Sequence, residues 1–380
     1  MYILAYELKK TASFYGIWAL VGLFLLFNLV ALTSPISEYA NYIANVSHDV
    51  GIVIDSNFNE RLNNLNVDIN SIRLQHDTYY IWNIFHGYST QYIAEAYIHE
   101  LNLSGLSETL MRRKYEQLQY AVNRLYESKA GITLYFAGAT SQRHLHLFEN
   151  VIIILLWQGI ILASLIMLLS LGHEYIVKTE MTIYSTKVGR RINIAKLISS
   201  LLAGVVTYVI LTSVTLAVYI YRNPFGATWN SSVSSGFNFI EDGIVGLRPF
   251  VTWHSFTVAS YLIAYIVVSI GLILCFGLMA YITGLFIRNG YIGFCILVIV
   301  NALLFDLPIR IFGFSLPAFI ANQLPISLAF RQDLRSLWFT DGAIFTIMPH
   351  FETGGTVGSL AILILLSIIA GARFKRRNIL

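Results

Sequence analysis

Charged residues are scarce in this chain. Asp, Glu, Lys and Arg make up only 12% of its 380 residues, whereas an ordinary soluble domain carries about 25%. Apolar residues account for 56% of the chain, and apolar runs of about 20 residues, long enough to cross a bilayer, recur along it. This composition excludes a soluble globular protein and indicates a protein built into a membrane.

Cysteine and nucleic-acid-binding patterns are also nearly absent. The two cysteines, Cys275 and Cys295, lie in apolar segments, and the long polar stretch 33–148 contains none. No disulfide framework is therefore expected. The formal charge is +4, but no basic stripe with interleaved aromatic residues is present. The sequence therefore gives no indication of binding to nucleic acid.

Motifs for catalysis and for cofactor binding are missing as well. The chain contains no GxxxxGKS or GxxxxGKT phosphate-binding loop and no nucleophile elbow. His173 and Glu174 lack the HExxH spacing of a metalloprotease. His144 and His146 are two residues apart and cannot share one helical face, so we expect interfacial side chains and no metal site. We therefore expect no enzyme activity and no cofactor in this chain.

Apolar stretches of membrane-spanning length define the fold class. The sequence predicts six transmembrane helices, at 14–32, 149–171, 197–221, 255–286, 291–311 and 357–372. The first stretch lacks a small-residue cleavage site, so we expect a retained anchor and not a signal peptide. The expected fold is an all-α polytopic membrane protein with a mainly helical insert between the first two spans.

Basic residues set the predicted orientation. Lys9 and Lys10 precede the first span, and a basic tail, 374–380, follows the last one. Because positive charge resists transfer across the membrane, both termini are expected in the cytoplasm. The domain plan is then 1–32 for the N-terminus and first span, 33–148 for the extracellular domain, and 149–373 for the remaining spans.

The extracellular segments carry their own patterns. In 33–148, Leu106, Leu110 and Leu118 recur near helical spacing with charges between them, which predicts a helix starting at Ser104 or Ser107 and stopping near Gly131.

Segment 312–351 combines prolines with many aromatic residues, which predicts short re-entrant helices at the outer leaflet. We expect Phe319 and Trp338 there to form an outer gate. The alternative is that these aromatic residues only anchor the protein in the membrane interface.

The polar bridge 173–196 lies between the second and third spans and is strongly basic. The bridge contains five basic residues and only two acidic ones, Glu174 and Glu180. This excess of positive charge predicts that the bridge lies in the cytoplasm. Spaced residues within it form one pattern: Glu174, Thr179 five positions on, Ser185, Gly189 followed by Arg190, and Lys196. The simpler interpretation is that these are ordinary cytoplasmic charges that meet lipid phosphates.

This pattern resembles the cytoplasmic loop of ABC-2 type transporter permeases. There a Glu opens a short helix, a Thr follows, a small-polar turn carries an Arg, and a Lys lies at the base of the next span. The six-span layout and the broken segment before the last span are similar to the same family. The resemblance covers 149–373 and the first span, whereas the insert 33–148 is longer than in the simplest family members.

The resemblance implies a function and partners. The chain would be the permease subunit of an ABC exporter, and the bridge would be a coupling helix that docks into a separate cytoplasmic ATPase, which binds ATP and Mg. A second permease subunit, identical or paralogous, would complete the route. The cargo would be amphipathic or hydrophobic, such as a peptide, a lipid-like molecule or a drug. Lys/Asn/Ile-rich usage favours a bacterial cell membrane as the location.

Other functional classes stay open. A membrane sensor or scaffold would use the extracellular domain to bind a ligand and the bridge to recruit a signalling partner. A secondary carrier or a membrane enzyme is a third possibility. Charges within the spans are few, which weakens an ion-coupled carrier. Asp306 and Arg310 are four residues apart, and we expect them to stabilise a helix end as an ion pair or to contact substrate.

Overall fold

The structure is a computed structural model that describes residues 2–65, 68–136, 141–179, 189, 192–287 and 289–376. Within these ranges the chain is mostly helical, and six helical stretches are long and apolar enough to cross a membrane. They are Tyr15–Leu32, Gln142–Ile176, Ile192–Arg222, Val258–Phe286, Gly290–Phe312 and Phe351–Phe374. The prediction of a helical, multi-pass membrane protein is confirmed.

Several spans are longer than the sequence predicts, among them α11 (Ile192–Arg222), which begins before the predicted residue 197. Two of these corrections show the physical reason most clearly. Helix α9 (Ile152–Ile176) continues past the apolar run and includes Glu174, which is buried by neighbouring helices. Helix α17 (Phe351–Arg376) begins before the predicted span and includes Glu352, which is also buried in protein. Charged residues end an apolar pattern in the sequence, but a helix continues through them when other helices cover them.

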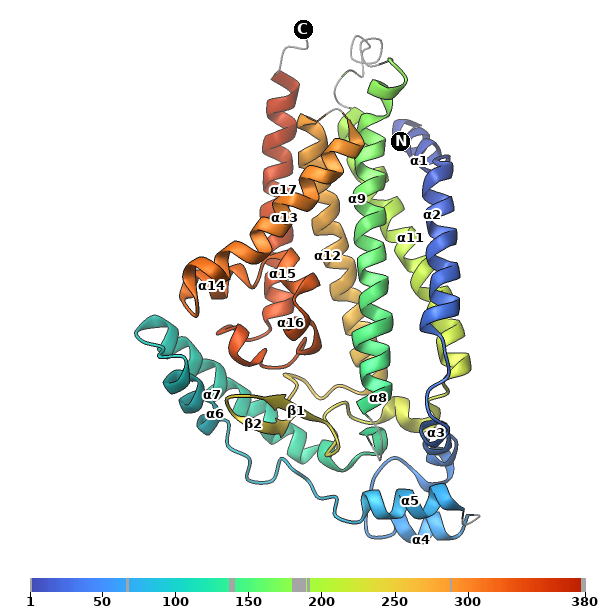
Figure 1. The fold of residues 1–380 in the computed structure, drawn as a ribbon, viewed down its shortest axis with the longest axis vertical. Helices are drawn as coiled ribbons and strands as arrows, with labels where there is room; N and C mark the ends of the chain where they lie inside the picture. The colour runs from blue at the N-terminus through green and yellow to red at the C-terminus, as the bar shows by residue number, and fades with distance from the viewer. Residues whose placement is uncertain are drawn as a thin grey trace.

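The helices form one elongated bundle (Figure 1). Helix α9 and helix α12 (Val258–Phe286) lie inside it, and α11 (Ile192–Arg222) packs closely on α9. Small residues permit this approach. A Cβ atom added to Gly159 of α9 would lie 2.7 Å from Tyr208 Cδ2 of α11, and one added to Gly204 of α11 would lie 2.9 Å from the Ala163 Cβ of α9.

A buried amide pair fixes the first span in place. Helix α2 (Tyr15–Phe27) ends in a π-helical turn, Asn28–Leu32. The Asn28 amide donates to Gln158 Oε1 at 2.9 Å and to Thr215 Oγ1 at 3.1 Å, and the Gln158 amide donates to Asn28 Oδ1 at 2.7 Å. Polar groups away from water need such partners, so these hydrogen bonds fix the position of the first span along α9 and α11.

Helix α1 (Tyr2–Ala12), the last turn of α17 and the helix ends that flank the bridge lie at the same end of the bundle (Figure 1). Helix α1 precedes α2 and packs on α11. Helices α9 and α11 flank the bridge, so the predicted bridge limits, 173 and 196, both fall inside helices. Residues 180–188, 190 and 191 lie outside the described part of the chain.

The insert lies at the opposite end (Figure 1). Its main helices are α3 (Glu38–Val50), α4 (Phe58–Asn63), α5 (Ile69–Thr78), α6 (Gln91–Glu100) and α7 (Leu106–Glu127), and the short α8 (Ser141–His144) leads into the second span. Helix α7 begins after Gly105, whose φ is 61°, and it has no serine cap. It ends at Glu127, before Lys129 in the left-handed region, and not near Gly131. The predicted start was therefore close to the observed one, next to Gly105, whereas the predicted stop lies a few residues too late.

Short elements fill the space between the insert and the bundle. Strands β1 (Phe239–Asp242) and β2 (Gly246–Pro249) form an antiparallel hairpin in which Phe239 faces Pro249. After α13 (Gly290–Phe312) come the short helices α14 (Leu316–Ala321), α15 (Pro325–Phe330) and α16 (Gln332–Ser336). Prolines open α14 and α15 because a first helical turn needs no N–H donor there.

Candidate functional site

Two predicted bridge residues form a buried ion pair. Lys196, at the start of α11, donates to a carboxylate oxygen of Glu174, near the end of α9. Their exposed fractions are only 1% and 4%. Glu174 also accepts a hydrogen bond of 2.7 Å from Lys10 Nζ of α1. The pair therefore binds the two ends of the bridge to each other and to the N-terminal helix.

Glu7 completes the group, which we name the basal charge cluster: Glu7, Lys10, Glu174 and Lys196. Lys10 Nζ lies 3.1 Å from Glu7 Oε2. Glu7 is fully buried, and neither of its carboxylate oxygens accepts a hydrogen bond within the described part of the chain. Acids and bases alternate through the cluster, so each buried charge lies beside one of opposite sign.

The basal charge cluster makes the arrangement of α1, α9 and α11 specific. Taking a charge out of water costs several kcal/mol, and removing one member of a buried pair costs about 3–5 kcal/mol. Separation of the three helices at this end therefore has a high free-energy cost. A ring contact lies beside the cluster, where Phe14, just after α1, stacks on His173 of α9 with ring centroids 5.8 Å apart.

The other predicted bridge residues are described only in part. Thr179 is exposed, and its backbone N–H donates to the Glu174 carbonyl at 2.9 Å, which closes the end of α9. Ser185 and Arg190 lie outside the described residues. Lys10 and Glu7 were missed as site residues. Their only signal in the sequence is a helical spacing of three just before the first span.

The two predicted gate residues are both buried in packing contacts, with exposed fractions of 1%. Trp338 lies against Tyr265 of α12, with ring centroids 4.7 Å apart, and its carbonyl accepts from Tyr261 at 3.0 Å. Phe319 belongs to the apolar cluster under α7, which includes Tyr115. The structure brings neither of them to an opening.

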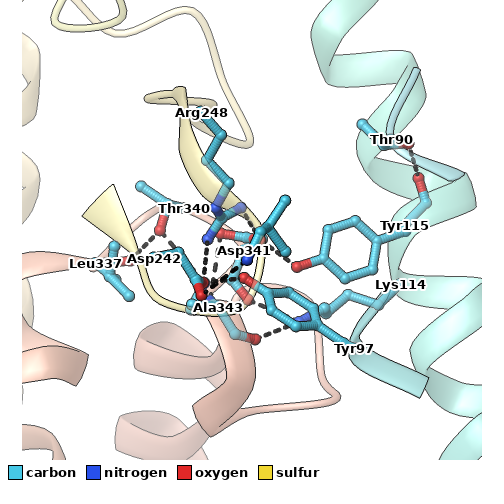
Figure 2. A network of polar contacts seen from close by, with 12 residues as sticks. Thr90, Tyr97, Lys114, Tyr115, Asp242, Arg248, Leu337, Thr340, Asp341 and Ala343 are labelled. Carbon is cyan, nitrogen blue, oxygen red and sulfur yellow. Dashed lines mark hydrogen bonds and ion pairs between the residues drawn. The ribbon is translucent and has the colours of Figure 1, made fainter. Parts of the chain in front are cut away.

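A polar network joins the insert to the segment that follows α16. Figure 2 shows Lys114 of α7 reaching the loop around Asp341. Its ammonium donates to the carbonyls of Asp341 at 3.0 Å, Ala343 at 3.0 Å and Thr346 at 2.7 Å. Ala343 has a φ of 46°. This backbone conformation is unfavourable for a residue with a side chain, and the Lys114 contacts hold it in place.

Asp341 is the centre of this network. Its carboxylate accepts from Arg248 of β2 at 2.6 Å and from the Tyr115 hydroxyl. The Tyr97 hydroxyl of α6 donates a hydrogen bond to the carboxylate of Asp242 in the hairpin. The network therefore ties α6, α7, the hairpin and the loop 337–346 into one unit (Figure 2).

Burial and neighbouring charges shift the pKa values within the network. Burial lowers the pKa of Lys114 to about 7, against the attraction of Asp341. Burial alone would raise the pKa of Asp341, but Arg248 and Lys114 outweigh it and hold the pKa at about 2. Asp341 is therefore charged at neutral pH, and its ion pair with Arg248 is intact.

The fold and these sites define a polytopic helical membrane protein. The basal charge cluster lies at one end of its bundle, and the polar network around Asp341 holds the insert at the other end. No three His, Cys, Asp or Glu side chains converge as metal ligands among the residues that the structure describes. The chain matches no protein-family model and no curated protein. Its function is therefore inferred from the arrangement of its own residues.

Proposed function

We propose that this chain is the transmembrane permease subunit of an ATP-driven exporter of the ABC-2 type. A separate cytoplasmic ATPase would bind ATP and Mg and act on the bridge 173–196. One observation carries the proposal: the basal charge cluster closes the base of the bridge and links it to α1. A force applied to the bridge would then move α1, α9 and α11 together.

A continuous set of contacts could carry that movement to the far end of the bundle. Trp157 of α9 stacks on Phe330 of α15, with ring centroids 5.4 Å apart, and its indole N–H donates to the Ala329 carbonyl at 3.4 Å. Arg335 of α16 lies 5.3 Å over the Trp157 ring. The segment after α16 is in turn held by Lys114 of the insert.

In this proposal the ends of the bundle face opposite sides of a bacterial cell membrane. The termini and the bridge are cytoplasmic, the insert is extracellular, and segment 312–351 caps the route as re-entrant helices. Phe319 and Trp338 would gate by separation of their packed surfaces, since both are buried at rest. The cargo would be amphipathic or hydrophobic, such as a peptide.

A second permease subunit would complete the route. Helices α2, α13 and α17 leave many large apolar side chains uncovered, including Leu26, Val298 and Ile362. Lipid covers such surfaces in a membrane, and a second subunit would replace lipid along part of them. The mechanism needs this partner because six spans are too few to enclose a route alone, and α9 is mostly buried among the other helices of one copy.

Photo-crosslinking tests the proposal directly. A benzoylphenylalanine replaces Ser185 in the full chain, expressed in its own host, with the same probe at the exposed Asn57 as the matched control. We expect the Ser185 probe alone to capture a protein that carries a phosphate-binding loop, identified by mass spectrometry. Capture of a signalling kinase would instead support the sensor, and no such capture at normal expression would refute the exporter.

A further inference from the structure

A cleft of about 870 Å³ opens on the surface of the insert. One wall is the outer face of α7, and the other is formed by residues 85–95. Its volume lies in the range of about 300–1,000 Å³ that is usual for ligand sites. The Thr90–Tyr115 hydrogen bond of Figure 2 lies in this cleft, but Glu116, Tyr120 and Glu127 take no part in the network around Asp341 or in the basal charge cluster. These three residues therefore have no role in the mechanism proposed above.

Hydrogen bonds hold the two walls in a fixed relation. The Gln119 amide of α7 donates to the Tyr88 carbonyl at 2.9 Å, and Gln119 Oε1 accepts from the Thr90 N–H at 2.9 Å. The Thr90 hydroxyl donates to the Tyr115 carbonyl at 2.6 Å. The cleft is therefore formed before any ligand arrives, which lowers the entropic cost of binding.

The free charges of the cleft are all negative. Arg112 is the one basic residue that lines it, and Arg112 is neutralised by ion pairs with Glu95 and Glu108. Glu116 and Glu127 also line the cleft, and neither has a hydrogen bond or ion pair through its carboxylate within the described part of the chain. The insert as a whole has eleven acidic residues against eight basic ones over 33–148. A cationic ligand would meet a favourable potential here.

Aromatic rings lie between these carboxylates. Glu116, Tyr120, Asn123 and Glu127 are spaced by four, three and four residues, which places them on one face of α7. The Tyr120 ring is 72% exposed, whereas Tyr97 of the same domain is buried. An exposed tyrosine face binds apolar side chains and cations.

We propose that this cleft binds an extended cationic peptide. Eleven residues of α7 span about 16 Å between Glu116 and Glu127, which equals about five residues of an extended chain. The preferred peptide therefore has two positive residues about five positions apart and an apolar or aromatic residue between them. Glu116 and Glu127 pair with the cations, and Tyr120 packs on the residue between them. The inference concerns binding alone and holds whether or not the chain exports cargo.

The test uses the full chain in nanodiscs of neutral phosphatidylcholine, with empty nanodiscs as a blank. The probe is a fluorescent, end-blocked hexapeptide with lysine at both ends and tryptophan inside, and a matched peptide carries glutamate in place of lysine. Binding is followed by fluorescence anisotropy. We expect saturable binding of the lysine peptide only, and affinity that falls as salt is added.

Variants assign the binding to the cleft. The double variant E116Q/E127Q should weaken the lysine peptide about tenfold, whereas E60Q/E100Q, at exposed acids of the same insert outside the cleft, should leave it unchanged. Tyr120→Ala should weaken binding, whereas Tyr92→Ala should not, although both tyrosines are 72% exposed. The charge reversal E116K/E127K should bind the glutamate peptide instead. Equal affinity of wild type and E116Q/E127Q, or no saturable binding by wild type, would overturn the proposal.

Discussion

Lys10 Nζ lies 2.7 Å from Glu174 Oε1, although 164 positions separate these two residues in the chain. Through this contact the N-terminal helix shares the buried charge that also joins α9 to α11. The first span is thus connected to the base of the bridge by an ion pair and not only by apolar packing. Such a connection is directional, because the charges match in one arrangement of the helices only.

Lys10→Ala should destabilise the protein by at least about 2 kcal/mol, because it leaves the buried Glu7 without a partner of opposite charge. Lys9→Ala is the matched control, since Lys9 is exposed and has no ion pair among the described residues. Thermal unfolding of both variants in the same detergent measures the difference. Equal midpoints for the two would show that the basal charge cluster contributes little.

A double variant separates lost charge balance from lost packing. In E7Q/K10A the pair of Glu174 and Lys196 remains, and no unbalanced charge is buried. We therefore expect the double variant to be more stable than Lys10→Ala alone, because removing both partners costs less than removing one. Additive losses would instead assign the effect to packing.

The sequence predicted the spans well but missed half of the charge cluster, for a physical reason. A membrane span is a local property, because about 20 apolar residues in a row suffice to define it. Glu174 and Lys196 were predicted as coupling residues from a pattern within one short bridge, and not as an ion pair. Glu7 and Lys10 were not predicted as site residues, because their role depends on a contact made far along the chain. A local pattern cannot report such a contact.

The far end of the bundle gives the same lesson. Phe319 and Trp338 were singled out as large aromatic residues, but their burial depends on α7 and α12, which are distant in sequence. The ion pair of Arg248 with Asp341 likewise joins a hairpin to a loop 93 positions away. The ion pair of Asp306 with Arg310 was predicted correctly, because it lies within one helix.

Labelling of single cysteines tests the orientation. In a background without Cys275 and Cys295, cysteines replace Asn57 in the insert, Ser185 in the bridge and Asn378 in the tail. An impermeant thiol reagent added to intact cells should label position 57 alone, because the bridge and both termini are expected in the cytoplasm. All three should react after the cells are opened. Labelling of Ser185→Cys in intact cells would refute the topology.

The charged state of Asp341 should make stability depend on acid pH. Its pKa is about 2 in the folded protein, below the ordinary value of 3.8. A carboxyl group with a lowered pKa stabilises the fold fully above its unfolded pKa and loses that contribution as pH falls through the folded one. The contribution is about 2 kcal/mol, so it should be present above about pH 4 and lost by about pH 2.

Asp341→Asn should therefore be less stable than wild type at neutral pH, and this gap should narrow between about pH 4 and pH 2. Asp49→Asn is the control, since Asp49 is exposed. Unfolding midpoints across this pH range measure the gap. A difference that stays constant down to pH 2 would mean that titration of Asp341 does not stabilise the network.

The last prediction concerns the gate. Alanine at Phe319 or Trp338 should alter cargo export or leak without abolishing ATPase binding, but such truncation of a buried aromatic residue also costs about 3–5 kcal/mol of stability. Phe319→Leu and Trp338→Phe are gentler probes. The Trp338 indole N–H has no hydrogen-bond partner within the described residues, so Trp338→Phe removes no bond there. Phe314→Leu, at an exposed position of the same segment, is the control.

Export and ATPase recruitment are measured in each variant at normal expression. If both buried positions have a gating role, export or leak changes in their variants and stays normal in Phe314→Leu. If all of these variants, alanine included, export and leak as wild type does, the aromatic residues serve packing alone and the gate lies elsewhere.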